Sequence, residues 1–79
     1  MPTVLRIGPY RFFFYSDELQ EPAPIHVESA EKEAKFWLLP VLLSWNDGFR
    51  SGELAEIDDL IRTNLELLLE AWNDFFETR

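Results

Sequence analysis

The stretch of sequence that decides the fold is Tyr10-Arg11-Phe12-Phe13-Phe14-Tyr15. Aromatic residues favour β-strands, in which successive side chains point to opposite faces of the sheet. A strand with one solvated face alternates apolar and polar residues. Here Phe12 and Phe14 would point to one face, and Phe13 and Tyr15 to the other. We therefore predict a strand whose two faces both need cover, and the second face is a candidate interface.

The composition indicates one small domain. The chain has 79 residues, of which 47% are hydrophobic and 15% aromatic, enough for a modest core that oligomerisation would help to stabilise. The absence of cysteine excludes disulfides and thiolate metal sites and fits the cytoplasm. No apolar stretch reaches the roughly 18 residues of a membrane helix, and the N-terminus does not read as a signal peptide. We expect a cytoplasmic protein without a membrane partner.

The negative charge is concentrated in the C-terminal part of the chain. The formal net charge is -8, and residues 51–79 hold eight acidic residues against Arg62 and Arg79. Five of the seven basic residues lie in the first 50 positions, which are therefore nearly neutral. Because strong acidity repels a phosphate backbone, nucleic acid is disfavoured as a partner.

The first 50 residues are predicted to form an antiparallel sheet of four to five strands. The strands are expected at 3–7, 10–15, 24–28, 33–38 and 41–45, the last being a short strand or an extended segment. Gly8-Pro9 and the segment 29–32 turn the first and second hairpins. Residues 16–24, with three acids and two prolines, are expected to be a loop.

The register of the second hairpin has two solutions. Its apolar faces match only if the numbers of paired residues add to an odd value. A sum of 63 places Glu28 opposite Lys35, and cross-strand charge pairing favours it by roughly 0.5 kcal/mol. A sum of 61 places Glu28 opposite Glu33 and suits a tight two-residue turn. We favour 63 on charge, and in both registers His26, Lys35 and Trp37 share one face.

The segment from residue 51 onward is predicted to be a C-terminal amphipathic helix. Ser51 is the expected N-cap, and apolar residues recur at helical spacing from Leu54 to Phe76 opposite an acidic stripe. No proline or internal glycine interrupts this pattern, so one helix is favoured, with a weak point at Thr63-Asn64. A helix of about 37 Å exceeds a six-residue strand of about 20 Å, so it overhangs the sheet or bends near Asn64. The expected fold is a single α+β domain, 1–79, with a sheet (1–50) packed on one long helix (51–79).

Several segments resemble the prokaryotic family "domain of unknown function 4160" over nearly the whole chain. They are Met1–Arg6, Arg11–Ser16, Pro22–Val27, Ala34–Leu38 and Glu66–Asn73. The family's usual Pro-Pro-His-x-His-Val pattern reads Pro22-Ala23-Pro24-Ile25-His26-Val27 here, so His26 is kept and Pro24 replaces the first histidine. The resemblance implies a neighbouring gene for a second small family, "domain of unknown function 2442", in pairs grouped with toxin–antitoxin modules. It implies no established activity.

His26 is the centre of the candidate catalytic chemistry. With Arg11 and Lys35 stabilising phosphate charge, it could serve a small RNA-directed enzyme or toxin. The chain offers no Gly-rich phosphate loop, and His26 with Glu28 gives two ligands where a metal needs three or four. We therefore expect no metal and no cofactor. The competing interpretation is a histidine packed on Trp37, with Arg11 and Lys35 solvated or salt-bridged.

A protein-interaction module is the favoured function. Apolar surface on the second sheet face and the helix end would meet either a second copy of the chain or a small protein encoded nearby. The candidate binding residues are Phe13, Tyr15, His26, Trp37, Leu69, Trp72 and Phe76.

Overall fold

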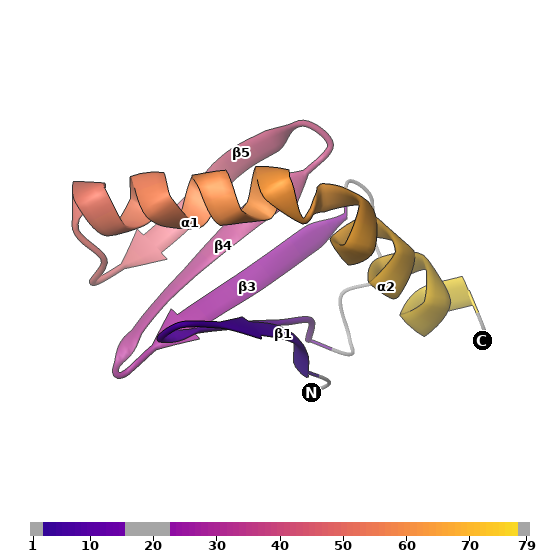
Figure 1. Ribbon diagram of the computed structural model, residues 1–79, viewed down its shortest axis with the longest axis horizontal. Coiled ribbons are helices and arrows are strands. Elements are labelled where there is room, and N and C mark those ends of the chain that lie inside the picture. The colour runs from indigo at the N-terminus through magenta and orange to yellow at the C-terminus, as the bar shows by residue number, and fades with distance from the viewer. Residues whose placement is uncertain (1–2, 16–22, 78–79) are drawn as a thin grey trace.

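The computed structural model describes residues 3–15 and 23–77 (Figure 1). Its elements are β1 (Thr3–Ile7), β2 (Tyr10–Phe13), β3 (Pro24–Ser29), β4 (Lys32–Leu38), β5 (Val41–Asp47), α1 (Ser51–Thr63) and α2 (Leu65–Glu77). The strands form one antiparallel sheet in the order β1-β2-β3-β4-β5, and both helices lie on one face of it. This confirms the predicted α+β class. Most of the predicted 16–24 loop lies outside the described residues.

The aromatic stretch is buried on both of its faces, as its pattern requires. Phe12, Phe13 and Phe14 are each at most 1% exposed, although the strand itself ends at Phe13 rather than at Tyr15. Phe12 and Phe14 belong to the core beneath the helices, together with Ile57 and Ile61 of α1. Phe13 points to the opposite side, which we call the outer face. Burying one such side chain contributes about 1.5–3 kcal/mol.

The predicted register of the β3–β4 hairpin is wrong. Glu28 pairs with Glu33, so the sum is 61, and Ala30-Glu31 forms the two-residue turn. The tight turn prevails because the repulsion between the two carboxylates is relieved by their neighbours. Arg11 Nη1 lies 3.0 Å from Glu28 Oε2, and the Tyr15 hydroxyl donates to Glu33 Oε2 at 3.1 Å.

The N-cap of α1 is Arg50, and not Ser51 as predicted. A side-chain acceptor at the cap is replaced by a carboxylate that reaches back from the first turn. The backbone N–H of Arg50 donates to Glu53 Oε1 at 2.9 Å, which is the reciprocal half of a capping box. The helix therefore starts where Glu53 can satisfy an otherwise unpaired donor.

The predicted single long helix is broken at Asn64. The Asn64 side chain donates from Nδ2 to the Leu60 carbonyl at 2.8 Å, and its backbone N–H donates to the same oxygen at 3.1 Å. The residue has φ -109° and ψ 21°, outside the helical range, so α2 leaves at an angle to α1 (Figure 1). The bend solves the overhang, because Phe75 and Phe76 then pack on Phe14, with ring centroids 6.3 and 6.0 Å away. Neither α1 nor α2 has the length and apolar character needed to cross a bilayer.

Candidate functional site

The strand register arranges the outer face in rows that run across the sheet. The charged row consists of Arg6, Arg11, Glu28, Glu33 and Asp47, one residue from each strand in spatial order. The aromatic row consists of Phe13, His26, Lys35 and Trp45. The predicted strand phases are correct here, because Arg11, His26 and Lys35 do share one face.

His26 lies inside a cage of aromatic rings. Its ring centroid is 4.4 Å from that of Tyr15, 5.5 Å from that of Phe13 and 5.9 Å from that of Trp45. Its Nδ1 lies 3.2 Å from Glu33 Oε2, and the residue is 3% exposed. The surrounding rings and this burial leave a substrate little access to the imidazole.

The two cations of the candidate catalytic set are held against the sheet. Arg11 donates from Nε to Thr3 Oγ1 at 2.8 Å, pairs with Glu28 and lies over the Phe13 ring at 4.5 Å. Lys35 lies over the Trp37 ring at 4.6 Å. The pairing of Arg11 with Glu28 fits the salt-bridged interpretation of that residue, whereas the stacking of Lys35 on Trp37 was not predicted. Within residues 3–15 and 23–77, no cluster of three or more potential metal ligands occurs.

Trp45 is the outer-face residue that the sequence reasoning missed. Regular alternation from Val41 would direct Trp45 toward the helices. The β4–β5 ladder, however, shifts register between Lys35 and Phe36, which pair with Trp45 and Leu43 and leave Ser44 extra. This bulge returns Trp45 to the side of His26. No signal in the sequence marks the bulge.

The predicted binding residues divide into two groups by exposure. Phe13, His26 and Trp72 are buried, whereas Tyr15, Trp37, Leu69 and Phe76 are half-buried. The large hydrophobic side chains that are most exposed lie elsewhere in the described part of the chain. They are Leu39, Leu42, Leu43, Trp45 and Leu67.

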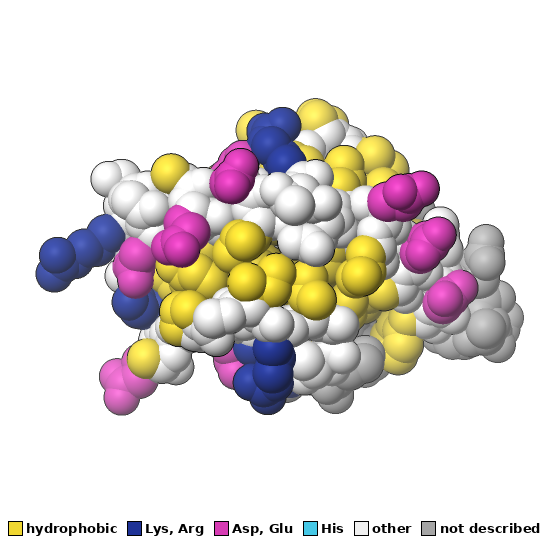
Figure 2. All heavy atoms as spheres, in the orientation of Figure 1, with side chains coloured by type: hydrophobic (Ala, Val, Ile, Leu, Met, Phe, Trp, Pro, Cys, Tyr) yellow, Lys and Arg dark blue, Asp and Glu magenta, His cyan; other side chains and the backbone are white. Residues whose placement is uncertain are grey.

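A groove opens between β1 and α2 on the helix side of the sheet. It has a volume of about 580 Å³ and is lined by Thr3, Val4, Phe14, Leu67, Glu70, Ala71, Asp74 and Phe75. Figure 2 shows the same side of the molecule, with an apolar band across its middle and acidic side chains along its upper and right-hand parts. The groove thus combines an apolar lining with two carboxylates.

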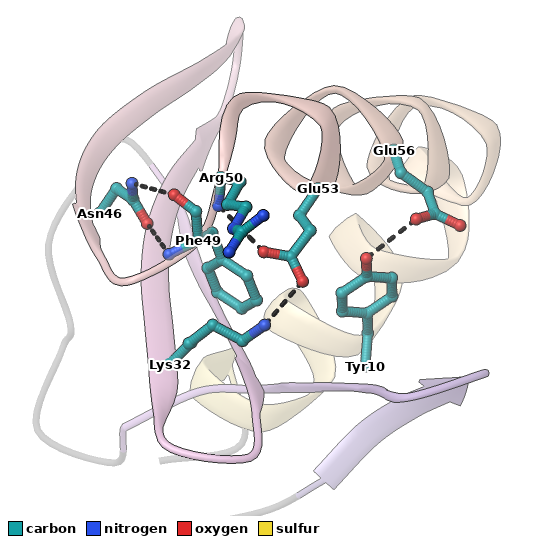
Figure 3. Close-up of polar contacts among 7 residues, drawn as sticks. All are labelled: Tyr10, Lys32, Asn46, Phe49, Arg50, Glu53 and Glu56. Atoms are coloured by element: carbon teal, nitrogen blue, oxygen red, sulfur yellow. Dashed lines mark hydrogen bonds and ion pairs between the residues drawn. The ribbon is translucent and has the colours of Figure 1, made fainter.

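A polar frame ties the start of α1 to the sheet (Figure 3). Lys32 Nζ donates to Glu53 Oε2 at 2.6 Å, and the Tyr10 hydroxyl donates to Glu56 Oε1 at 2.9 Å. The backbone N–H of Arg50, followed by Lys32, lowers the pKa of Glu53. Burial, followed by the bond to Glu56, raises the pKa of Tyr10 to about 12. These contacts give the four side chains of Lys32, Glu53, Tyr10 and Glu56 a structural role at the junction of α1 and the sheet.

The chain is thus a small α+β domain, in which an antiparallel sheet of consecutive hairpins is covered on one face by the two helices α1 and α2. The sequence model of the family described as "Domain of unknown function (DUF4160)" matches residues 10–73, from β2 into α2. The chain therefore belongs to this family, as the sequence segments predicted. No curated protein and no solved structure matches the chain.

Proposed function

We propose that this protein is a protein-interaction module that binds its partner in the groove between β1 and α2. The observation that carries the proposal is the apolar lining, in which Leu67 is 45% exposed. Clustered apolar surface of this kind marks contact sites on proteins. The neighbouring band in Figure 2 would extend the contact along the helix side of the sheet.

The chemistry of the groove indicates the kind of segment that it would take. Glu70 and Asp74 line it beside Ala71 and Phe75 of the same helix. An amphipathic segment with an apolar stripe and flanking Lys or Arg residues would match both features. We propose that the small protein encoded nearby supplies this segment, and that the two form one toxin–antitoxin pair.

The alternative, an RNA-directed enzyme using His26, Arg11 and Lys35, has weaker support. His26 is caged by three rings, and Arg11 is engaged by Thr3 and Glu28. A phosphate would have to displace these contacts before it reached the imidazole.

Leu67→Glu tests the interaction module. The wild-type chain or the variant is co-expressed with the neighbouring gene product, and complex formation is measured by light scattering and titration. Because the substitution puts a third carboxylate into the groove, we expect affinity to fall by about tenfold or more.

Leu43→Glu is the matched control for this experiment. Leu43 is 40% exposed but lies on β5, away from the groove, so this variant should bind as the wild type does. Equal affinities for all three chains, or no complex with the wild type, would contradict the proposal.

A further inference from the structure

The charged row of the outer face is positive at one end and negative at the other. Its β1 end carries Arg6 and Arg11, and its β5 end carries Glu33 and Asp47. The interior charges are satisfied within the chain, since Arg11 pairs with Glu28 and Glu33 accepts the Tyr15 hydroxyl. The two end residues, Arg6 and Asp47, are exposed. The structure gives neither of them an ion pair among the described residues.

A row of this kind is complementary to a second copy of itself. Neighbouring strands are about 4.8 Å apart, so four intervals place the two ends roughly 19 Å from each other. A two-fold axis that runs between two stacked outer faces, parallel to β3, would carry each positive end onto the negative end of the other copy. Two identical ion pairs then form at once, as an isologous interface requires.

Apolar side chains are exposed on the same face at the β5 side. Leu42 pairs with Trp37 and is 58% exposed, and Trp45 pairs with Lys35 and is 42% exposed. A contact between two outer faces would cover both residues in each copy. Tryptophan is enriched among the residues that dominate binding energy at interfaces.

The distribution of charge favours this face over the others for self-association. Most of the net charge of -8 comes from residues 51–79, and the helices lie on the opposite side of the sheet. Packing outer face to outer face therefore keeps the two acidic helical layers apart, with two sheets between them.

We propose that two copies of this chain form a dimer through their outer faces, with Arg6 of each copy paired to Asp47 of the other. The contact leaves the groove between β1 and α2 open in both copies. The dimer would thus present two grooves, one on each side. This inference uses a different surface and does not rest on the proposed partner binding.

Charge reversal tests the dimer. Sedimentation equilibrium over a concentration series is run on the wild type, Arg6→Asp, Asp47→Arg and the double variant. Each single variant places two like-charge pairs in the interface, so we expect its dimer dissociation constant to rise about tenfold or more. The double variant restores both pairs and should return to within about threefold of the wild type.

Mixing gives a sharper readout from the same proteins. Arg6→Asp and Asp47→Arg, each of which dimerises weakly by itself, should form a heterodimer when combined, because the mixture has opposite charges at both contacts and relieves the like-charge pairs of the single variants. Asp59→Arg is the matched control. It makes the same charge change at an exposed position of α1, on the other side of the sheet, and should dimerise as the wild type does.

Four outcomes would overturn the proposal. They are a wild-type chain that stays monomeric at every concentration, single reversals without effect, a double variant that stays as weak as the single ones, and open-ended assemblies larger than a dimer. Because Arg6 and Asp47 are exposed, the variants should fold, and circular dichroism verifies this.

Discussion

Tyr10 has a polar hydroxyl group but is buried in the core. It is 4% exposed, and burial, followed by its hydrogen bond to Glu56, raises its pKa to about 12 from an ordinary value near 10. Below pH 10 the hydroxyl is protonated in both the folded and the unfolded chain, and its full contribution to stability is present. Between about pH 10 and 12 only the unfolded tyrosine loses its proton, so stability falls as the pH rises.

Tyr10→Phe should therefore change both the stability and its pH dependence. At pH 7 we expect a loss of about 1 kcal/mol, because the bond to Glu56 is removed while the ring stays in place. As the pH rises from 10 to 12, the wild type should lose its advantage over the variant. Urea unfolding of both proteins across this range measures the difference, and parallel pH profiles would contradict the assignment.

At the scale of elements, the connection from β5 to α1 depends on the backbone of Gly48. The Asn46 side chain accepts the backbone N–H of Phe49 at 3.1 Å and donates to its carbonyl at 3.0 Å (Figure 3). Gly48 between them has φ +106°, and a Cβ there would lie 2.9 Å from Lys32 Cγ. A side chain at this position would both strain the backbone and push Lys32 away from Glu53.

Gly48→Ala should destabilise the protein by roughly 1–3 kcal/mol. Gly52→Ala is the control, because Gly52 lies in the first turn of α1 without a positive φ, and a Cβ added there would meet no atom within 4 Å. The control should be stabilising by up to about 1 kcal/mol. Thermal or urea unfolding compares the two, and equal effects would show that the turn does not constrain residue 48.

At the scale of the whole molecule, Phe14 is one of the residues that join the sheet to α2. Phe14 packs on Phe75 and Phe76 of α2, whereas Phe13, its equally buried neighbour, packs on His26 and Tyr15 of the outer face. The two residues thus hold different layers of the structure together. Elements held by few contacts open locally before the whole protein unfolds.

Phe14→Leu should consequently loosen α2 more than the rest of the molecule. We expect both Phe14→Leu and the matched control Phe13→Leu to cost roughly 1–2 kcal/mol in global stability. Hydrogen–deuterium exchange should show faster exchange in α2 only for Phe14→Leu. Faster exchange of α2 in both variants, or in neither, would contradict this division of roles.

Much of the fold and of the candidate site could be predicted from residue patterns. The aromatic stretch indicated a strand whose two faces both need cover, and its phase placed Phe12 and Phe14 on one face, which the helices cover. The same phases brought Arg11, His26 and Lys35 to one face. These features were readable because the alternation of side chains is a property of the local backbone. The family resemblance was likewise carried by short segments of sequence and is confirmed.

The tertiary structure decided the features that depend on sums of weak, distant contacts. The turn at Ala30-Glu31 outweighed charge pairing because Arg11 and Tyr15, from elsewhere in the chain, relieved Glu28 and Glu33. The bulge after Leu43 moved Trp45 to the outer face, and packing on Phe14 accompanies the bend at Asn64. Each of these choices involves about 1 kcal/mol or less per contact, which no local pattern records.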